Sequence, residues 1–355
     1  SRDLYSTKRI KNIMLPYFSE KYGNPSSLHS FGREAAKAIS MARDNMALLL
    51  NCKASELYFT SGGTESDNWV IKGIYYANKD KGNHIITTKI EHKAILNSCK
   101  RLEKDGAEIT YLNVDKYGVV DLKQLEKSIT DKTILVSVMT ANNEVGTIQP
   151  IAQIGEICKK HNVLFHTDAV QAIGAVDIDV KRDNIDLLSM SAHKFYGPKG
   201  IGALYIRNGV KTDRYISGGS QERGMRGGTS NVPLIVGMAA AFEKAVRNLK
   251  ENNKKLSALR DKLIERIEKE IPNAHLNGHR TNRLSNNVNF CFEFIEGEAL
   301  LLSLDIKGIA GSSGSACTSG TLDPSHVLLA IGLPHEIAHG SLRLTLGDQN
   351  TQEEI

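Results

Sequence analysis

Between about residues 56 and 206, short apolar runs and helical stretches alternate with a regularity that leaves few folds open. Seven runs fit β-strands, at 57–60, 85–88, 109–114, 134–139, 163–167, 187–191 and 203–206. Helical patterns separate most of them, as in 151–161, where Ile151, Ile154 and Cys158 share one face. We therefore predict an α/β fold with a mostly parallel seven-stranded sheet covered on both faces, in which the last two runs form a hairpin-like pair.

The pattern changes after Asn231. An amphipathic helix runs from Ile235 to Leu249 into a polar break at 251–255, and a second helix follows that ends at Pro272. The remaining sequence mixes helices with a strand-like run at 287–292. We expect a large domain over 14–245, and a smaller α+β domain formed by 1–13 and 246–355.

Composition narrows the function classes. The 355 residues include 45 Lys and Arg and 40 Asp and Glu, giving a formal charge of +5 that is spread along the chain and does not predict nucleic-acid binding. No apolar run reaches about 18 residues and no export signal is visible, so we expect no membrane association. The five cysteines are odd in number and far apart, which argues against disulfides and a zinc site and favours the cytoplasm.

A lysine follows the strand at 187–191, in the segment Ser191-Ala-His-Lys194-Phe-Tyr-Gly-Pro-Lys-Gly200. An amine on a strand-end loop can form a Schiff base with an aldehyde cofactor when burial and nearby charge keep its reactive form available. Ser191 and His193 beside it could bind a phosphate. Taken alone, a lysine in a polar loop is more often a solvated surface residue.

An acid ends the strand at 163–167, in Phe165-His-Thr-Asp168-Ala-Val-Gln171. Enzymes that use pyridoxal 5'-phosphate (PLP) need a carboxylate to keep the pyridine nitrogen protonated, because the ring then withdraws electrons from the substrate. Asp168 fits that role, and Gln171 could bond to the phenolic oxygen of the ring. A helix N-cap at Asp168 is the alternative.

Three further strand ends carry polar or glycine-rich segments, where open α/β sheets bind ligands. Paired glycines after 57–60 lead into a helix whose first N–H groups, with Gly63 and Thr64, could cradle a phosphate. Thr64 and Asp67 have the spacing of a capping box, and a plain tight turn is the alternative. His92 could stack on a ring and transfer protons, and Asn143 could reach the ring oxygen. Together these segments favour a PLP site.

Cys317 lies in the run Gly311-Ser-Ser-Gly-Ser-Ala-Cys317-Thr-Ser-Gly320. A loop of small residues can carry a thiol into and out of a site. The alternative is a small buried cysteine, but this run has little apolar material with which to bury one. We expect Cys317 to be reactive, and the other four cysteines to be inert.

In combination, the segments 60–68, 142–146, 193–202 and 311–320 resemble the class V group of fold-type I PLP-dependent transferases, and within it the cysteine desulfurases of the NifS and IscS type. The likeness runs from Met14 to Glu354 in the order of the family. It departs at both ends: residues 1–7 lack the Asp-Asn-x-Ala-Thr-Thr segment of the family, and many members continue beyond Ile355 into a segment used in partner docking. We expect these departures to affect full activity and scaffold binding more than the catalytic residues.

The resemblance assigns roles to individual residues. Lys194 would be the Schiff-base lysine, Asp168 the pyridinium partner and His92 the stacking residue. The other contacts to the ring or the phosphate would come from Gly63, Thr64, Asn143, Gln171, Ser191 and His193.

Substrate and subunit contacts also follow from the resemblance. Arg343 would pair with the substrate carboxylate through two parallel hydrogen bonds, and Asn24 and His29 would border the substrate pocket. Thr229, in the loop 218–229, would reach the phosphate of a partner subunit, which implies a homodimer.

The implied activity is cysteine desulfuration. Lys194 would move a proton from Cα of L-cysteine, and the Cys317 thiolate would attack the substrate sulfur. The products would be L-alanine and a persulfide on Cys317, for iron-sulfur cluster assembly or other sulfur transfer. The expected sulfur acceptor is an iron-sulfur scaffold protein of the IscU or NifU type.

Two other functions stay open at this stage. One is a class V aminotransferase or β-lyase, which shares PLP, and Cys317 argues against it. The other is a binding or regulatory module without turnover, and the presence of Lys194, Asp168 and His92 argues against that.

Overall fold

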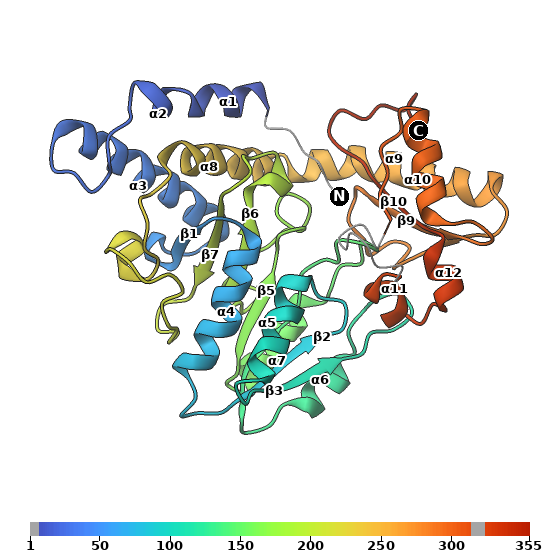
Figure 1. The fold of residues 1–355 in the computed structure, drawn as a ribbon, viewed down its shortest axis with the longest axis horizontal. Coiled ribbons are helices and arrows are strands. Elements are labelled where there is room, and N and C mark those ends of the chain that lie inside the picture. Colours follow the sequence, from blue (N-terminus) through green and yellow to red (C-terminus); the bar gives the residue numbers. More distant parts are fainter. Residues whose placement is uncertain (1–6, 314–323) are drawn as a thin grey trace.

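The computed structural model describes residues 7–313 and 324–355, and its central element is a seven-stranded sheet (Figure 1). The strands lie in the order β1-β7-β6-β5-β4-β2-β3. Their bounds are β1 Leu57–Thr60, β2 His84–Thr88, β3 Glu108–Leu112, β4 Thr133–Ser137, β5 Leu164–Asp168, β6 Leu187–Ser191 and β7 Gly202–Ile206. All neighbours pair in parallel except β7, which is antiparallel to both β1 and β6. The predicted α/β class, the mostly parallel sheet and the final antiparallel pair are confirmed.

Two strands end earlier than predicted. Beyond β3, Val114 leaves the sheet and pairs with Val120 in an isolated bridge. Beyond β4, the N–H of Met139 donates to the Glu91 carboxylate at 3.0 Å instead of continuing the ladder. The apolar pattern overran both strands because apolar residues continue to pack after the sheet pairing stops: Val138 and Met139 stay buried, and Val114 is half-buried.

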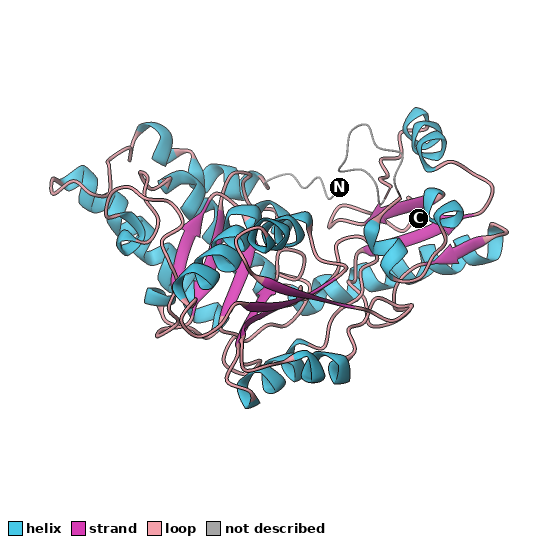
Figure 2. Ribbon diagram, turned by 60° about the horizontal axis from the view of Figure 1, so that its bottom comes forward, coloured by secondary structure: helices cyan, strands magenta, loops and turns pink. Residues whose placement is uncertain are grey.

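Helices cover both faces of the sheet (Figure 2). Alternate strand residues point to opposite faces, so Leu187 and Leu188 of β6 belong to separate cores. One core includes residues of α4 Gly63–Ala77 and α5 Lys93–Glu103. The other includes residues of α3 Ser30–Leu50, α6 Leu122–Ser128, α7 Ile151–Lys160 and α8 Val232–Arg247.

The first helices pack on the large unit. α1 Lys8–Met14 is followed by α2 Pro16–Ser19, and Ile10 is buried in the same core as Phe242 of α8. We expected residues 1–13 to belong to the smaller domain. In the described part of that segment, which starts at Thr7, α1 packs on α8 and Ile10 is buried in the core of the large unit.

A pair of helices connects the large and small units. α8 and α9 Leu249–Glu270 run almost end to end along one side of the molecule (Figure 1). The chain breaks at Asn248, and the predicted break at 251–255 is wrong, because those residues are helical. They were misleading because this polar stretch forms the first turns of an amphipathic helix whose buried face starts only at Leu256.

The small unit is an α+β layer, as predicted. Its three strands, β8 Ala274–Leu276, β9 Asn287–Phe292 and β10 Ser341–Thr345, are antiparallel in the order β10-β9-β8. Ile264 and Ile267 of α9 pack on Val288 and Phe290 of β9. Three short helices complete it, α10 Gly297–Ile306, α11 His326–Ala330 and α12 His335–His339. Among the described residues, no helix has both the length and the apolar character needed to cross a bilayer.

Candidate active site

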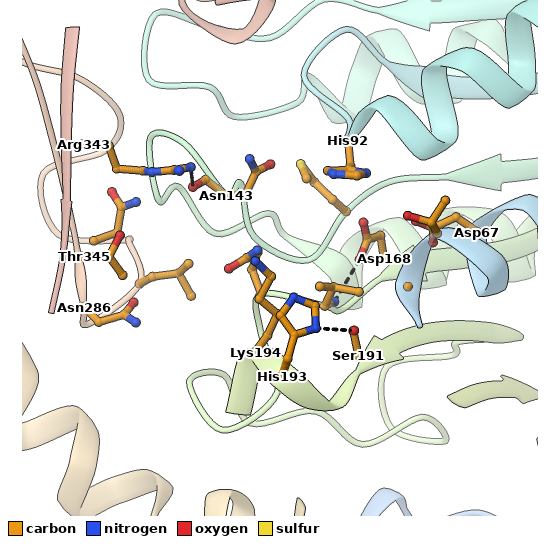
Figure 3. Close-up of a pocket in the computed structure, with 17 residues that line it drawn as sticks. Asp67, His92, Asn143, Asp168, Ser191, His193, Lys194, Asn286, Arg343 and Thr345 are labelled. Atoms are coloured by element: carbon orange, nitrogen blue, oxygen red, sulfur yellow. Dashed lines mark hydrogen bonds between the residues drawn. The ribbon is translucent and has the colours of Figure 1, made fainter. Parts of the chain in front are cut away.

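A cavity of about 270 Å³ lies at the carboxyl ends of the central strands and is closed on one side by the small sheet (Figure 3). β1, β2, β4, β5 and β6 all lead into it, because β7 is antiparallel to its two neighbours and leaves the other strands pointing the same way. The predicted site residues that line the cavity are Gly63, Thr64, His92, Asn143, Asp168, Gln171, Ser191, His193, Lys194 and Arg343.

Lys194 lies on a short 3₁₀ turn, Ala192–Phe195, directly after β6. The turn ends at Tyr196, which has a left-handed φ of 66°, and the N–H of Gly197 donates to the Ala192 carbonyl at 2.9 Å. This tight turn projects the half-buried Lys194 side chain towards the cavity beside His193 (Figure 3).

Asp168 is the last residue of β5 and is buried. One of its oxygens, Oδ1, accepts a hydrogen bond from the Val170 N–H at 2.9 Å, so the N-cap-like contact is present and the residue still lines the cavity. Burial raises the pKa of Asp168, whereas the charges of His92 and Lys194 lower it. Those two residues therefore favour the ionised carboxylate.

The start of α4 forms the expected anion cradle. Gly62 has a φ of 154°, which side-chain-bearing residues rarely adopt, and a Cβ on Gly63 would lie 2.7 Å from Val170 Cγ2. The backbone can approach a ligand closely here, and the first N–H groups of the helix point at it. Ser191 Oγ lies 2.9 Å from His193 Nδ1 at the same end of the cavity.

The predicted capping box is wrong. The N-cap of α4 is Gly62, which makes no side-chain capping bond, and the Glu65 carboxylate accepts from the Ser61 N–H at 2.8 Å just before the helix. Asp67 is instead buried and faces the cavity. Sequence reasoning thus missed Asp67 as a site residue because the spacing of an acid near a helix start is typical of a cap.

His92 and Asn143 occupy the cavity wall opposite Lys194 (Figure 3). His92 is the N-cap of α5, and its Nδ1 accepts a hydrogen bond from the Ala94 N–H at 3.2 Å, which fixes the ring orientation. The loop carrying Asn143 is held by the neighbouring Asn142, whose Oδ1 accepts from the N–H groups of Glu144 and Val145 at 2.8 and 2.9 Å.

Arg343 reaches the cavity from β10 of the small sheet. Its Nη1 donates to the Asn143 carbonyl at 2.7 Å, and its Nε and Nη2 donate to Ser312 Oγ at 3.1 and 2.9 Å. The guanidinium therefore bridges the two units at the mouth of the site. Besides Asp67, six residues that line the cavity were not singled out from the sequence: Met139, Val170, Leu284, Asn286, Asn287 and Thr345.

Three predicted residues do not line this cavity. Asn24 and His29 are exposed, and His29 caps α3, with its Nδ1 accepting from the Gly32 N–H at 3.3 Å. Thr229 lines a separate hollow beside Ser61. Cys317 lies outside the described residues.

The cysteines that the structure describes are all free thiols. Burial raises the pKa of Cys52 and Cys99 to about 12 and that of Cys291 to about 11, and it also raises the pKa of Cys158. Because the thiolate is the nucleophile, these four residues are poor nucleophiles near neutral pH.

The residues present fit PLP. A buried carboxylate for the ring nitrogen, an amine for the aldehyde and a cradle that a side chain at Gly63 would fill all face one cavity. Asp67 Oδ1 is buried there without a hydrogen-bond partner among the described residues, as expected of a polar group that faces a ligand site. On this sheet topology, such an arrangement defines the PLP-dependent enzymes of fold type I.

Comparisons with known proteins narrow the class. The family model for aminotransferase class-V matches residues 6–355. Cysteine desulfurase IscS of Clostridium botulinum (strain Hall) is 61% identical over 357 residues, covering 100% of this chain and 90% of the relative. Cysteine desulfurase IscS of Methanosarcina thermophila is 60% identical over 348 residues, covering 98% of this chain and 86% of the relative.

Solved structures agree. A NifS-like protein superposes with a TM-score of 0.93 at 42% identity, covering 99% of this chain and 93% of that chain. SspA in complex with cysteine superposes with a TM-score of 0.86 at 38% identity, covering 97% of this chain and 96% of that chain. The chain belongs to the aminotransferase class-V family, and within it to the cysteine desulfurases of the NifS and IscS type.

Proposed function

We propose that this protein is a PLP-dependent cysteine desulfurase that converts L-cysteine to L-alanine and leaves the sulfur as a persulfide on Cys317. The observation that carries the proposal is the convergence of Lys194, Asp168 and Arg343 on one cavity. These three side chains supply the amine, the anion and the carboxylate-binding cation that the reaction needs. They come from the turn after β6, the end of β5 and the middle of β10.

The cofactor would be held at both ends of the cavity. Asp168 would keep the ring nitrogen protonated, His92 would stack on the ring, and Gln171 and Asn143 would contact its oxygen. The start of α4, with Ser191 and His193, would take the phosphate. When bound, PLP supplies an electron-withdrawing ring that stabilises negative charge at the substrate Cα.

The residues of the chain would divide the remaining work. Arg343 would bind the substrate carboxylate, exchanging its bonds to Ser312 Oγ for two parallel ones. The Lys194 amine would take the proton from Cα and return one later. The Cys317 thiolate would attack the substrate sulfur, forming an S–S bond as the C–S bond breaks, with the electrons of that bond staying on carbon. Protonation of that carbon completes alanine.

Alanine formation from L-cysteine tests this proposal. We expect the wild-type protein with PLP to release alanine, and Lys194→Ala to release none. Cys317→Ala should keep the visible absorption band of bound cofactor but lose alanine formation, because only the sulfur-accepting group is missing. Cys52→Ala, at a half-buried thiol outside the cavity, is the matched control and should behave as wild type.

Two results would contradict the proposal. Unchanged turnover of L-cysteine by Cys317→Ala would remove the persulfide step. A wild-type protein that transfers the amino group of L-cysteine to an added keto acid, and makes no alanine, would indicate an aminotransferase.

A homodimer is part of the proposal. Large apolar side chains are exposed on and between α1, α2 and α3, including Leu15, Phe18, Tyr22, Leu28 and Phe31. An apolar surface of this kind is typical of a protein interface. Thr229 would then reach the phosphate of the partner subunit, and Asn24 and His29 would approach a substrate pocket.

The sulfur acceptor would be an iron-sulfur scaffold protein of the IscU or NifU type, and the site of action would be the cytoplasm. Family membership supports the acceptor, and the free thiols among the described residues support a reducing compartment. A pull-down with purified scaffold, followed by transfer of labelled sulfur from L-cysteine, tests the acceptor. Label that stays on the desulfurase in the presence of scaffold would exclude it.

A further inference from the structure

Asp67 lies at the inner end of the cavity and has no role so far. It follows Gly63 and Thr64 by about one helical turn on α4, so the same helix face carries all three towards the cavity. Asp67 is 1% exposed, and its side chain lies beside Asp168 (Figure 3). Among the described residues its Oδ1 has no hydrogen-bond partner, and His166 Nε2 is 3.9 Å away.

Among the described residues, no cationic group lowers the pKa of Asp67. His166 is fully buried between two hydroxyls, with Nδ1 2.8 Å from Ser137 Oγ and Nε2 3.0 Å from Ser189 Oγ. Burial lowers the pKa of His166 to about 3, so the ring is neutral. Among the described residues, the Ser189 hydroxyl near Asp67 lowers the pKa of that carboxyl.

The other charged neighbours of Asp67 are anionic. Burial raises the pKa of Asp67 well above its usual value, and the charges of Asp168 and Glu91 raise it further. Glu91 is itself buried, and burial raises its pKa to about 8. Only Asp168 is stabilised as an anion by His92 and Lys194. Buried carboxyls this close do not all ionise, and the one that faces cations keeps the charge.

We propose that Asp67 is a positioning residue of the cofactor site that works as a neutral acid, leaving the single negative charge on Asp168 and turning one more hydrogen-bonding oxygen towards the ring end of the cavity. The inference rests on the proposed function, since it requires that the cavity holds PLP. The proposal makes Asp67 neutral and Asp168 ionised. The substitution Asp→Asn should therefore have different effects at the two positions.

A matched pair of variants tests this on the PLP-loaded protein. Asp67→Asn replaces a neutral acid by a neutral amide of the same shape, so we expect PLP affinity and the pH midpoint of the visible cofactor band to stay close to wild type. Asp168→Asn makes the same chemical change at the charged partner, and we expect a midpoint shift of about one pH unit or more. Asp67→Ala removes the hydrogen-bonding group, and PLP affinity should fall about tenfold.

Each outcome decides between the alternatives. If Asp67→Asn moves the midpoint as far as Asp168→Asn does, Asp67 carries a charge and the proposal is wrong. If Asp67→Ala also matches wild type, Asp67 positions nothing and the proposal is equally wrong. Should Asp67→Ala fail to fold, Ser189→Ala replaces it, because it removes the hydroxyl that faces Asp67. We then expect weaker PLP binding, and wild-type binding would overturn the proposal.

The proposed function fails separately. A wild-type protein that shows no visible band with PLP excludes the cofactor site itself. Normal wild-type binding with the wrong pattern among the variants excludes only the role of Asp67.

Discussion

At the scale of single residues, burial changes the pKa of carboxyl groups near the cavity, and Glu91 is an example. Glu91 accepts hydrogen bonds from Thr88 Oγ1 at 2.7 Å and from the Met139 N–H at 3.0 Å, yet no cation in the described part of the chain offsets the effect of burial on its pKa. Glu91 immediately precedes His92 of the cavity wall, so we expect the protonation state of Glu91 to affect the stability of that wall. Its pKa has a consequence that can be measured on the whole fold.

The first prediction concerns Glu91→Gln and pH. The folded-state pKa of Glu91 is raised from 4.5 to about 8, so between those values the unfolded chain loses a proton that the folded chain keeps. The free energy of unfolding therefore falls as pH rises through this window, by about 1.4 kcal/mol per pH unit from this group alone. Glu91→Gln should remove that contribution. Urea denaturation from pH 5 to 8 measures it, with buried Trp69, the only tryptophan, as the fluorescent probe.

Glu251→Gln is the control, because Glu251 is exposed on α9 and its loss should leave the pH dependence unchanged. If Glu91→Gln and wild type lose stability in parallel between pH 5 and 8, Glu91 is ionised in the folded protein and the pKa assignment is wrong.

The second prediction concerns Arg343→Lys. A lysine keeps the charge but cannot form two parallel hydrogen bonds to a carboxylate, so we expect KM for L-cysteine to rise about tenfold while kcat changes less. Steady-state alanine formation measures both constants. Arg247→Lys, at an exposed i,i+4 pair with Glu243, should leave both unchanged. A loss confined to kcat would argue that Arg343 does not bind the substrate carboxylate.

Residue identities were the easiest part of the site to predict. Three of them lie in or directly after a strand and within a distinctive sequence motif: Lys194, Asp168 and Arg343. The fold then brings their side chains to one cavity. Asp67 was missed because an acid near a helix start is typical of a cap, and its burial beside the cavity follows only from the packing of α4 on the sheet. Cys317 was singled out by its glycine and serine neighbours, and it remains a prediction.

At the scale of elements, the site depends on how closely α4 approaches the loop after β5. The third prediction is that Gly63→Ala weakens PLP binding about tenfold, because the new Cβ would lie 2.7 Å from Val170 Cγ2 and displace the start of α4 from its anion. Absorbance titration with PLP measures the affinity.

The double variant Gly63→Ala with Val170→Ala is the matched rescue, since removing Val170 Cγ2 makes room for the Cβ. We expect it to recover part of the lost affinity. No recovery would mean that the backbone conformation at Gly63, and not the contact with Val170, limits binding.

Helices and strands were predictable where the spacing of the apolar residues and the length of the apolar run indicated the same type of element. The strands at 187–191 and 287–292 were placed to the residue, because each is buried along its length and bounded by turn residues. The α8–α9 junction was misplaced because a run of polar residues looks the same in a linker and on the exposed side of a long helix. Only the contact of Leu256 and Leu259 with the small unit distinguishes them.

At the scale of the whole molecule, the proposed homodimer requires a surface on which the second subunit binds. The fourth prediction is that Leu28→Asp, at a side chain 90% exposed in this chain, shifts the protein from dimer to monomer. A charge is costly in an apolar interface because it must be desolvated. Light scattering coupled to size-exclusion chromatography measures the mass.

Leu302→Asp, on α10 with a side chain 66% exposed, is the control and should leave the dimer intact. If the wild-type protein is a monomer, or if Leu28→Asp leaves a dimer unchanged, the surface between α2 and α3 is not the subunit interface. Sequence alone could not locate this surface, because an exposed leucine differs from a buried one only once the chain has folded.

The bridge that Arg343 makes to Ser312 and Asn143 affects how tightly a substrate can be held. An incoming carboxylate does not meet a vacant cation; it displaces a hydroxyl that already occupies two of the guanidinium nitrogens. The affinity of a carboxylate for Arg343 is thus the difference between two competing attachments, and a ligand that cannot form two parallel hydrogen bonds to the guanidinium gains little from the exchange. The internal contact between Arg343 and Ser312 therefore sets the binding strength that a carboxylate must exceed.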